Sequence, residues 1–354
     1  MLYNAVSTLG LSKRLQTANT ELQLERLRNN DEIASGKHFD VAKALGARTG
    51  QAIALRNLYD ETDQTLKSTA LLQGRLGTMD SALTNILSAG QDVLAAASVG
   101  LGQPSPTGSS LQVRARAMLE QVVGMLNASS GNGYLFGGVE VKAAPMRAVQ
   151  GDESGLPSPI QIVQDTIAAA TGGTSSPQTP AETAAAVAAL DDLFAAPSAA
   201  PLGFEGGFYL GAPSTAPRLS ARLDRSTEIP YGIQGNDPAM RDLLQGLYML
   251  ASVDTSQLPL DAYKPYMEAA VAKVSGGIEG VRDATAQLGI HRAQLDDIAA
   301  MNTTQLRILN DQLDAMESVD PAEASLRMNQ LEVQIEATAA ATARIARMSL
   351  ANYL

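Results

Sequence analysis

Residues 55–97 read LRNLYDETDQTLKSTALLQGRLGTMDSALTNILSAGQDVLAAA, and their regular spacing of apolar residues gives the strongest structural signal in the chain. Its apolar or small residues recur at alternating steps of three and four, which is the spacing of one helix face held for six heptads. These seam positions are Leu55, Leu58, Thr62, Thr65, Thr69, Leu72, Leu76, Met79, Leu83, Ile86, Gly90, Val93 and Ala97. At about 1.5 Å per residue, the pattern predicts a helix roughly 60 to 80 Å long. Several of these seam side chains are small. The seam therefore favours close approach of a second helix, or packing against other subunits in an assembly.

The chain changes character on the C-terminal side of this helix. A break rich in Gly, Pro and Ser at residues 100–110 precedes a second predicted helix at 111–129. A turn and a predicted strand at 134–139 follow. Residues from about 140 to 230 are then rich in Ser, Thr, Pro, Gly and Ala, which predicts a small α+β insert with exposed loops.

Within this insert, local signals predict one short helix and two strands. Thr179 is placed to cap a helix whose first residue is Pro180, with Glu182 as the capping-box partner. Strands are predicted at 204–210 and at 218–225, and in the second one apolar residues alternate with polar ones.

Long helices return near the C-terminus. A seam from residue 288 to 316 has the same spacing as the first, and Asp320-Pro321 then restarts a helix as cap and first helical residue. The stretch before Gly36 is the natural partner of this last helix. Both terminal helices have narrow apolar stripes that polar residues interrupt, so each is marginal alone and we expect neighbours to cover it. The predicted subunit-interface residues are Leu15, Leu22, Leu331, Ile335 and Ile345.

The resulting fold prediction is a mainly α protein. Its long N- and C-terminal helices pair as a coiled-coil-like rod, and a small α+β outer insert comes from the middle of the chain. The composition agrees, because only 4% of the 354 residues are aromatic and Trp is absent. Leu, Ala, Val, Ile and Met must therefore fill the core, which suits helices laid side by side.

Charge and composition exclude several classes of function. The formal charge of −11 argues against nucleic acid and against an anionic membrane surface, since both require a basic face. Cysteine is absent, which removes disulfides, thiolate metal sites and thiol nucleophiles. Residues 1–6 show no start of a cleavable secretory signal, and no apolar run approaches the roughly 20 residues of a membrane span.

No catalytic constellation emerges from the residues. His38 and His291 are the two histidines and lie far apart in sequence, and His291 is interpreted as a solvated surface residue. Adjacent acidic residues such as Asp191-Asp192 point in different directions on a helix, so they are interpreted as solvated faces. We therefore expect no catalytic, cofactor-binding or metal-binding residues, no cofactor, and no enzymatic activity.

Motifs at both ends resemble the bacterial flagellin superfamily. At the N-terminal end these are Ile33-Ala34-Ser35-Gly36-Lys37, a serine-Gly-basic turn after the first helix, and Ala44-Leu45-Gly46-Ala47-Arg48. At the other end the likeness lies in Met328-Asn329-Gln330-Leu331 and in the ending Ser349-Leu350-Ala351-Asn352-Tyr353-Leu354. This ending resembles the family of hook-associated protein 3, which joins hook to filament, more than it resembles filament flagellins.

The resemblance implies three layers. Residues 1–40 and 320–354 would form an inner assembly layer of terminal helices. Residues 41–137 and 232–319 would form a helical rod, and residues 138–231 an outer insert.

The resemblance also implies a structural role at the junction of hook and filament. The chain would be exported unfolded by the flagellar type III apparatus and would end in the flagellum, outside the cell. Its partners would be hook-associated protein 1, flagellin, copies of itself in a ring and an export chaperone, with no nucleic acid and no membrane among them. Filament flagellin is the alternative within this class. A cytoplasmic coiled-coil signalling module is the alternative from another class, and an enzyme is the remote third.

Overall fold

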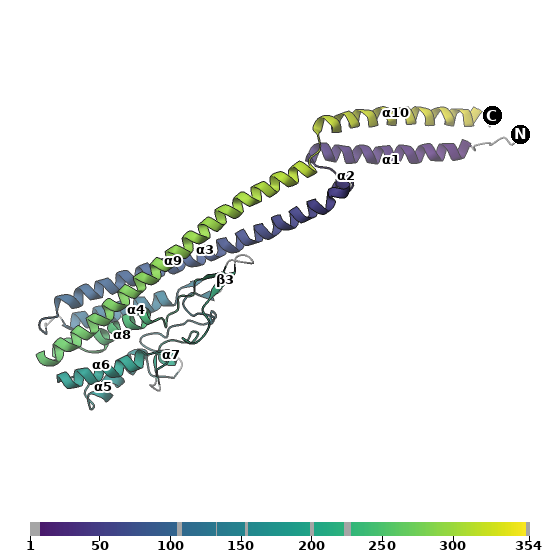
Figure 1. Cartoon of the computed structure of the whole chain (residues 1–354). Coiled ribbons are helices and arrows are strands. Elements are labelled where there is room, and N and C mark those ends of the chain that lie inside the picture. The colour runs from purple at the N-terminus through teal and green to yellow at the C-terminus, as the bar shows by residue number, and fades with distance from the viewer. Residues whose placement is uncertain are drawn as a thin grey trace. The chain divides into compact units, whose positions relative to one another are not determined.

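The structure is a computed structural model that describes residues 8–104, 108–131, 133–152, 155–198, 202–222 and 228–351 (Figure 1). The chain divides into two compact units. Unit 1 comprises Met1–Gln64 and Met301–Leu354, and unit 2 comprises Thr65–Ala300. The stretches 1–6 and 352–354, which the sequence analysis used, lie outside the described residues.

The described residues are mainly helical, with short strands only in the middle of the chain, which confirms the predicted fold class. The N-terminal half contains α1 (Thr8–Ser35), α2 (Val41–Leu45), η1 (Gly46–Arg48), α3 (Thr49–Val99), α4 (Gly108–Leu126), β1 (Ser129–Ser130), β2 (Gly133–Tyr134) and α5 (Pro159–Ala170). The C-terminal half contains α6 (Pro180–Phe194), α7 (Phe204–Gly207), β3 (Ser220–Arg222), β4 (Glu228–Pro230), α8 (Pro238–Ser252), η2 (Thr255–Gln257), α9 (Leu260–Glu317) and α10 (Pro321–Ala351). Two hairpins pair antiparallel, β1 with β2 and β3 with β4.

The predicted seam of α3 is the core of unit 2. Within this unit, seam residues of α3 such as Leu76, Leu83 and Ile86 are fully buried, together with side chains of α4, α8 and α9. Thr69, also in the seam, is buried and donates its hydroxyl to the Thr65 carbonyl at 2.9 Å. The seam spacing therefore predicted the buried face of α3 in unit 2.

Glycines let α8 approach α9 closely. A Cβ added at Gly277 of α9 would lie 2.5 Å from the backbone nitrogen of Leu243 in α8. A Cβ added at Gly246 of α8 would lie 2.6 Å from a methyl carbon of Val274. The two helices therefore pack backbone against backbone, and small residues replace the large rings that the composition lacks.

The insert has an aromatic core, and this corrects one sequence prediction. Residues 204–210 form the short helix α7 and a turn, not a strand. Phe204 and Phe208 stack with ring centroids 5.8 Å apart, and Phe208 meets Tyr248 of α8 edge-on at 5.2 Å. The backbone turns between these two rings, because Gly206 has a φ of +104° and the Phe208 N–H donates to the Phe204 carbonyl at 3.1 Å, neither of which fits an extended strand. The sequence prediction did not include this turn.

The capping residues predicted the start of helix α6 correctly. Thr179 accepts a hydrogen bond from the backbone N–H of Glu182 at 3.2 Å, as predicted for the start of α6. Helix α5 was not predicted, although Ser158 and Pro159 give it the same kind of start. The predicted strand at 134–139 is much shorter, since β2 ends at Tyr134. Of the predicted strand at 218–225, residues 220–222 form β3, and residues 223–225 lie outside the described residues.

Candidate assembly surface

Helices α1 and α10 of unit 1, the first and last helices of the chain, pack side by side and antiparallel (Figure 1). We call this pair of helices the terminal hairpin, or simply the hairpin. The buried side chain of Asn29 in α1 fixes their register, because its Nδ2 donates to the backbone carbonyl of Ala324 at 2.8 Å. Helix α10 begins as predicted, since Asp320 accepts from the backbone N–H of Ala322 at 2.8 Å and Pro321 is the first helical residue.

The predicted interface residues lie along the inside of this hairpin. Leu15 and Leu22 fall on the Asn29 face of α1 at heptad spacing, and Leu331, Ile335 and Ile345 continue the Ala324 face of α10. Leu331 is buried with 5% of its surface exposed, and the other four are half-buried. The structure therefore brings these residues together within one chain, so each end helix partly covers the stripe of the other.

A second set of apolar residues, which was not predicted, lies on the outer sides of the hairpin. Leu24 and Leu27 of α1 and Leu326 and Val333 of α10 are each between 49% and 66% exposed. They lie out of phase with the inner stripe, so a search for one continuous stripe passes over them. The available signal was a large apolar residue two or three positions away from each seam position.

The rest of unit 1 is also rich in exposed apolar side chains. Among the described residues, Ile53 and Leu58 of α3 and Met301 and Ile308 of α9 are at least 40% exposed. In contrast, the large buried core belongs to unit 2. Exposed apolar side chains do not stabilise a monomer. Their concentration in the smaller unit is therefore typical of an interaction surface.

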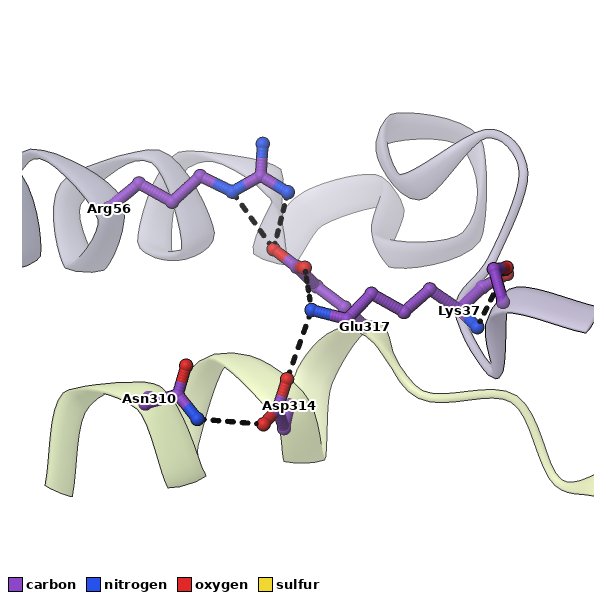
Figure 2. A network of polar contacts seen from close by, with 6 residues as sticks. Lys37, Arg56, Asn310, Asp314 and Glu317 are labelled. Atoms are coloured by element: carbon purple, nitrogen blue, oxygen red, sulfur yellow. Dashed lines mark hydrogen bonds and ion pairs between the residues drawn. The ribbon is translucent and has the colours of Figure 1, made fainter. Parts of the chain in front are cut away.

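Polar contacts hold the root of the hairpin (Figure 2). The carboxylate of Glu317, the last residue of α9, accepts from Nε and Nη2 of Arg56 at 2.9 and 2.6 Å. Its other oxygen accepts from Nζ of Lys37 at 3.4 Å, and Lys37 also pairs with Asp314 at 3.0 Å. We call Lys37, Arg56, Asp314 and Glu317 the Glu317 clasp.

The carboxylates of the clasp favour the protonated form of Lys37. The hydrogen bond to the Asp314 carboxylate raises the pKa of Lys37 above its ordinary value, with a further contribution from Glu317. Asn310 donates to the second oxygen of Asp314 at 2.9 Å and so orients that carboxylate. Lys37 therefore keeps its proton at neutral pH, and both Lys37 and Arg56 point toward Glu317.

A groove lies beside this root. Its volume is about 440 Å³, and its lining includes Arg28, Asn29, Phe39 and Arg327. The Arg28 guanidinium lies 5.7 Å from the centroid of the Phe39 ring, which is itself 58% exposed. The groove joins charges of both signs to an exposed ring, which suits contact with protein better than capture of a small apolar molecule.

The described residues hold little that points to catalysis. They contain no group of three or more His, Cys, Asp or Glu side chains arranged to hold a metal ion. His38 lies with its Nδ1 3.8 Å from a carboxylate oxygen of Glu32. His291 was predicted to be solvated, but it is half-buried in unit 2 and lines a pocket of about 310 Å³ with Arg218, Tyr231 and Asp237. Arg218 and Asp237 there pair with each other at 2.5 Å.

None of the described helices combines the length and the apolar character required to cross a bilayer.

Comparison with known protein families gives a match at each end of the chain. The model of the bacterial flagellin N-terminal helical region matches residues 6–140, and that of the bacterial flagellin C-terminal helical region matches residues 271–354. The two matches together span more than half of the chain and leave residues 141–270 unmatched. No curated protein sequence matches the chain.

Several solved structures resemble the chain, and two of them are flagellar proteins. A putative flagellar hook-associated protein from Vibrio parahaemolyticus has a TM-score of 0.50 at 9% identity, over 76% of this chain and 96% of that one. FlgL from Bacillus cereus has a TM-score of 0.48 at 13% identity, over 73% of this chain and 98% of that one. At these identities, the first likeness shows a shared fold and nothing finer.

Proposed function

Since this chain belongs to the bacterial flagellin superfamily and is a structural component of the flagellum, we propose that it is the adaptor that joins the hook to the filament. In this role it corresponds to hook-associated protein 3. It acts by packing against its neighbours rather than by catalysis.

The observation that carries the proposal is the exposed apolar surface of unit 1. The flagellin matches include the helices that bear it, and Leu27 of α1 and Val333 of α10 are 55% and 66% exposed. Burying apolar area removes roughly 25 cal/mol per Å² from the free energy of the system, so stacked subunits gain by covering these residues. The half-buried Leu15, Leu22, Ile335 and Ile345 lose their remaining exposure in the same step.

Two further features favour the junction over the filament. The ending Ser349-Leu350-Ala351-Asn352-Tyr353-Leu354 resembles the hook-associated protein 3 family more than filament flagellins. The Vibrio parahaemolyticus protein that shares the fold is described as a putative hook-associated protein.

The proposed partners follow from this position. They are hook-associated protein 1 on one side, flagellin on the other, and copies of the chain itself in a ring. The chain reaches this site outside the cell by export in an unfolded state through the flagellar type III apparatus, after release from a dedicated chaperone. Its lack of cysteine is compatible with this route.

Deleting the gene and viewing the cells by electron microscopy tests the proposal. We expect hooks without filaments, and flagellin released into the medium, because flagellin subunits then have no surface at the end of the hook on which to assemble. Filaments of normal number and length on the deletion strain would contradict the junction role. Loss of the main filament protein from sheared flagella would instead favour a filament flagellin.

A second experiment tests the terminal helices alone. A chain that lacks residues 321–354 has no α10, so α1 loses its partner while the core of unit 2 is untouched. We expect this variant to keep a folded middle and to be absent from purified flagella. Normal swimming with the truncated chain would refute the assembly mechanism.

A further inference from the structure

Glu317 occupies a position that its own helix disfavours. It is the last residue of α9, where the helix macrodipole places partial negative charge, so a carboxylate there is destabilising. Its side chain is also only 4% exposed, so water does little to solvate it. A buried carboxylate requires charged hydrogen-bond partners, and within the described residues Arg56 and Lys37 supply them.

The same site ties two connectors of the backbone together. One connector follows α1 and contains Lys37 and His38, and the other leads from α9 to α10 through Ser318 and Val319. The His38 N–H donates to the Glu317 carbonyl at 2.9 Å, and the Val319 N–H donates to the Gly36 carbonyl at 3.0 Å. These bonds form a short antiparallel bridge between Lys37 and Ser318.

We propose that the Glu317 clasp makes α1 and α10 gain or lose order as one hairpin. If the connector after α1 opens, Glu317 loses Lys37 and the bridge loses both bonds, so the connector to α10 is released as well. The same coupling acts in the other direction. Lys37 and Arg56 are about half exposed, so solvent screening keeps the clasp weak enough to open and close.

This device belongs to the chain itself and holds whether or not the chain is the junction adaptor. Its effect on assembly is that a neighbour which binds one terminal helix also orders the other. A subunit therefore presents both helices of its hairpin together.

Hydrogen exchange on the purified full-length chain tests the coupling. Glu317→Gln keeps the shape of the side chain and removes its charge, which weakens the bonds from Lys37 and Arg56. We expect exchange at His38 and Val319, and across both α1 and α10, to become faster by the same factor, on the order of tenfold. Exchange in unit 2 should not change. Asp311→Asn is the matched control, because this carboxylate lies on the same helix in an exposed pair with Arg307.

A second variant tests the transfer from one connector to the other. Lys37→Met changes a residue of the connector after α1 and removes its ion pairs with α9, but it changes no residue of the connector to α10. We nevertheless expect it to speed exchange at Val319 and in α10 as much as in α1. The proposal is overturned if His38 and Val319 are unprotected in the wild-type chain. It is also overturned if either variant affects one terminal helix alone, or if neither variant changes exchange at His38 and Val319.

Discussion

Single glycines set the spacing of the helices in unit 2. Gly276 and Gly277 are neighbours in α9, but a Cβ at Gly277 would collide with the backbone of Leu243, whereas a Cβ at Gly276 would meet nothing within 4 Å. Backbone cannot move aside as a flexible side chain can, so α8 would have to shift. Two adjacent residues of one type thus have opposite structural roles.

This difference leads to a paired prediction for unfolding. Gly277→Ala should lower the free energy of unfolding by about 1–3 kcal/mol through overpacking. Gly276→Ala should raise it by about 0.5–1 kcal/mol, because alanine loses less backbone freedom in a helix interior. Urea unfolding followed by circular dichroism measures both values. Equal effects of the two substitutions would contradict the close packing of α8 on α9.

At the scale of elements, the hairpin of α1 and α10 has an inner and an outer apolar set with different roles. The inner set stabilises the hairpin within one chain, whereas the side chains of the outer set stay 49% to 66% exposed. A substitution that leaves the inner set intact should therefore separate assembly from folding.

The double variant Leu27→Gln with Val333→Gln tests this separation. Exposed positions tolerate polar residues, so each substitution should change the stability of the monomer by no more than about 0.5 kcal/mol. Incorporation into flagella, measured by immunoblot of purified filaments with their hooks, should fall strongly. Leu331→Gln serves as the contrasting variant, because it acts on the buried inner set and should loosen the hairpin itself. Normal incorporation of the double variant would show that the outer set is not an interface.

Local and periodic signals explain why much of the fold could be predicted from sequence. The buried face of α3 follows from heptad spacing, and the starts of α6 and α10 follow from capping residues within a few positions. The turn at Phe204 could not be predicted in this way, because distant aromatic residues decide it. The inner stripe of the hairpin was predicted, but the Glu317 clasp was not, since it joins Arg56 to a residue 261 positions away.

For the molecule as a whole, alkaline pH is a probe of unit 2. Burial raises the pKa of Tyr209, Tyr248 and Tyr266 above the ordinary value of 10.0, and nearby Asp237 and Glu205 add to the effect at Tyr209. Because the folded pKa is the higher one, these tyrosines contribute stability that is fully present below the unfolded pKa. That stability is lost as the pH rises toward the folded value.

The expected result is a cooperative alkaline transition. Absorbance at 295 nm should show these buried tyrosines ionising only together with loss of helical circular dichroism, well above pH 10. In urea, all nine tyrosines of the chain should titrate near pH 10, which provides the reference. Ionisation of every tyrosine near pH 10 in a chain that keeps its helices would contradict the burial of these rings.

We propose that neighbours in the flagellum cover the outer apolar face of the terminal hairpin. The chain has no cysteine, so a single cysteine at Val333 can be labelled with a thiol reagent without background. We predict rapid labelling of the purified monomer, strong protection in intact flagella, and full labelling again once the flagella are dissociated. Equal labelling in the monomer and in intact flagella would contradict the account.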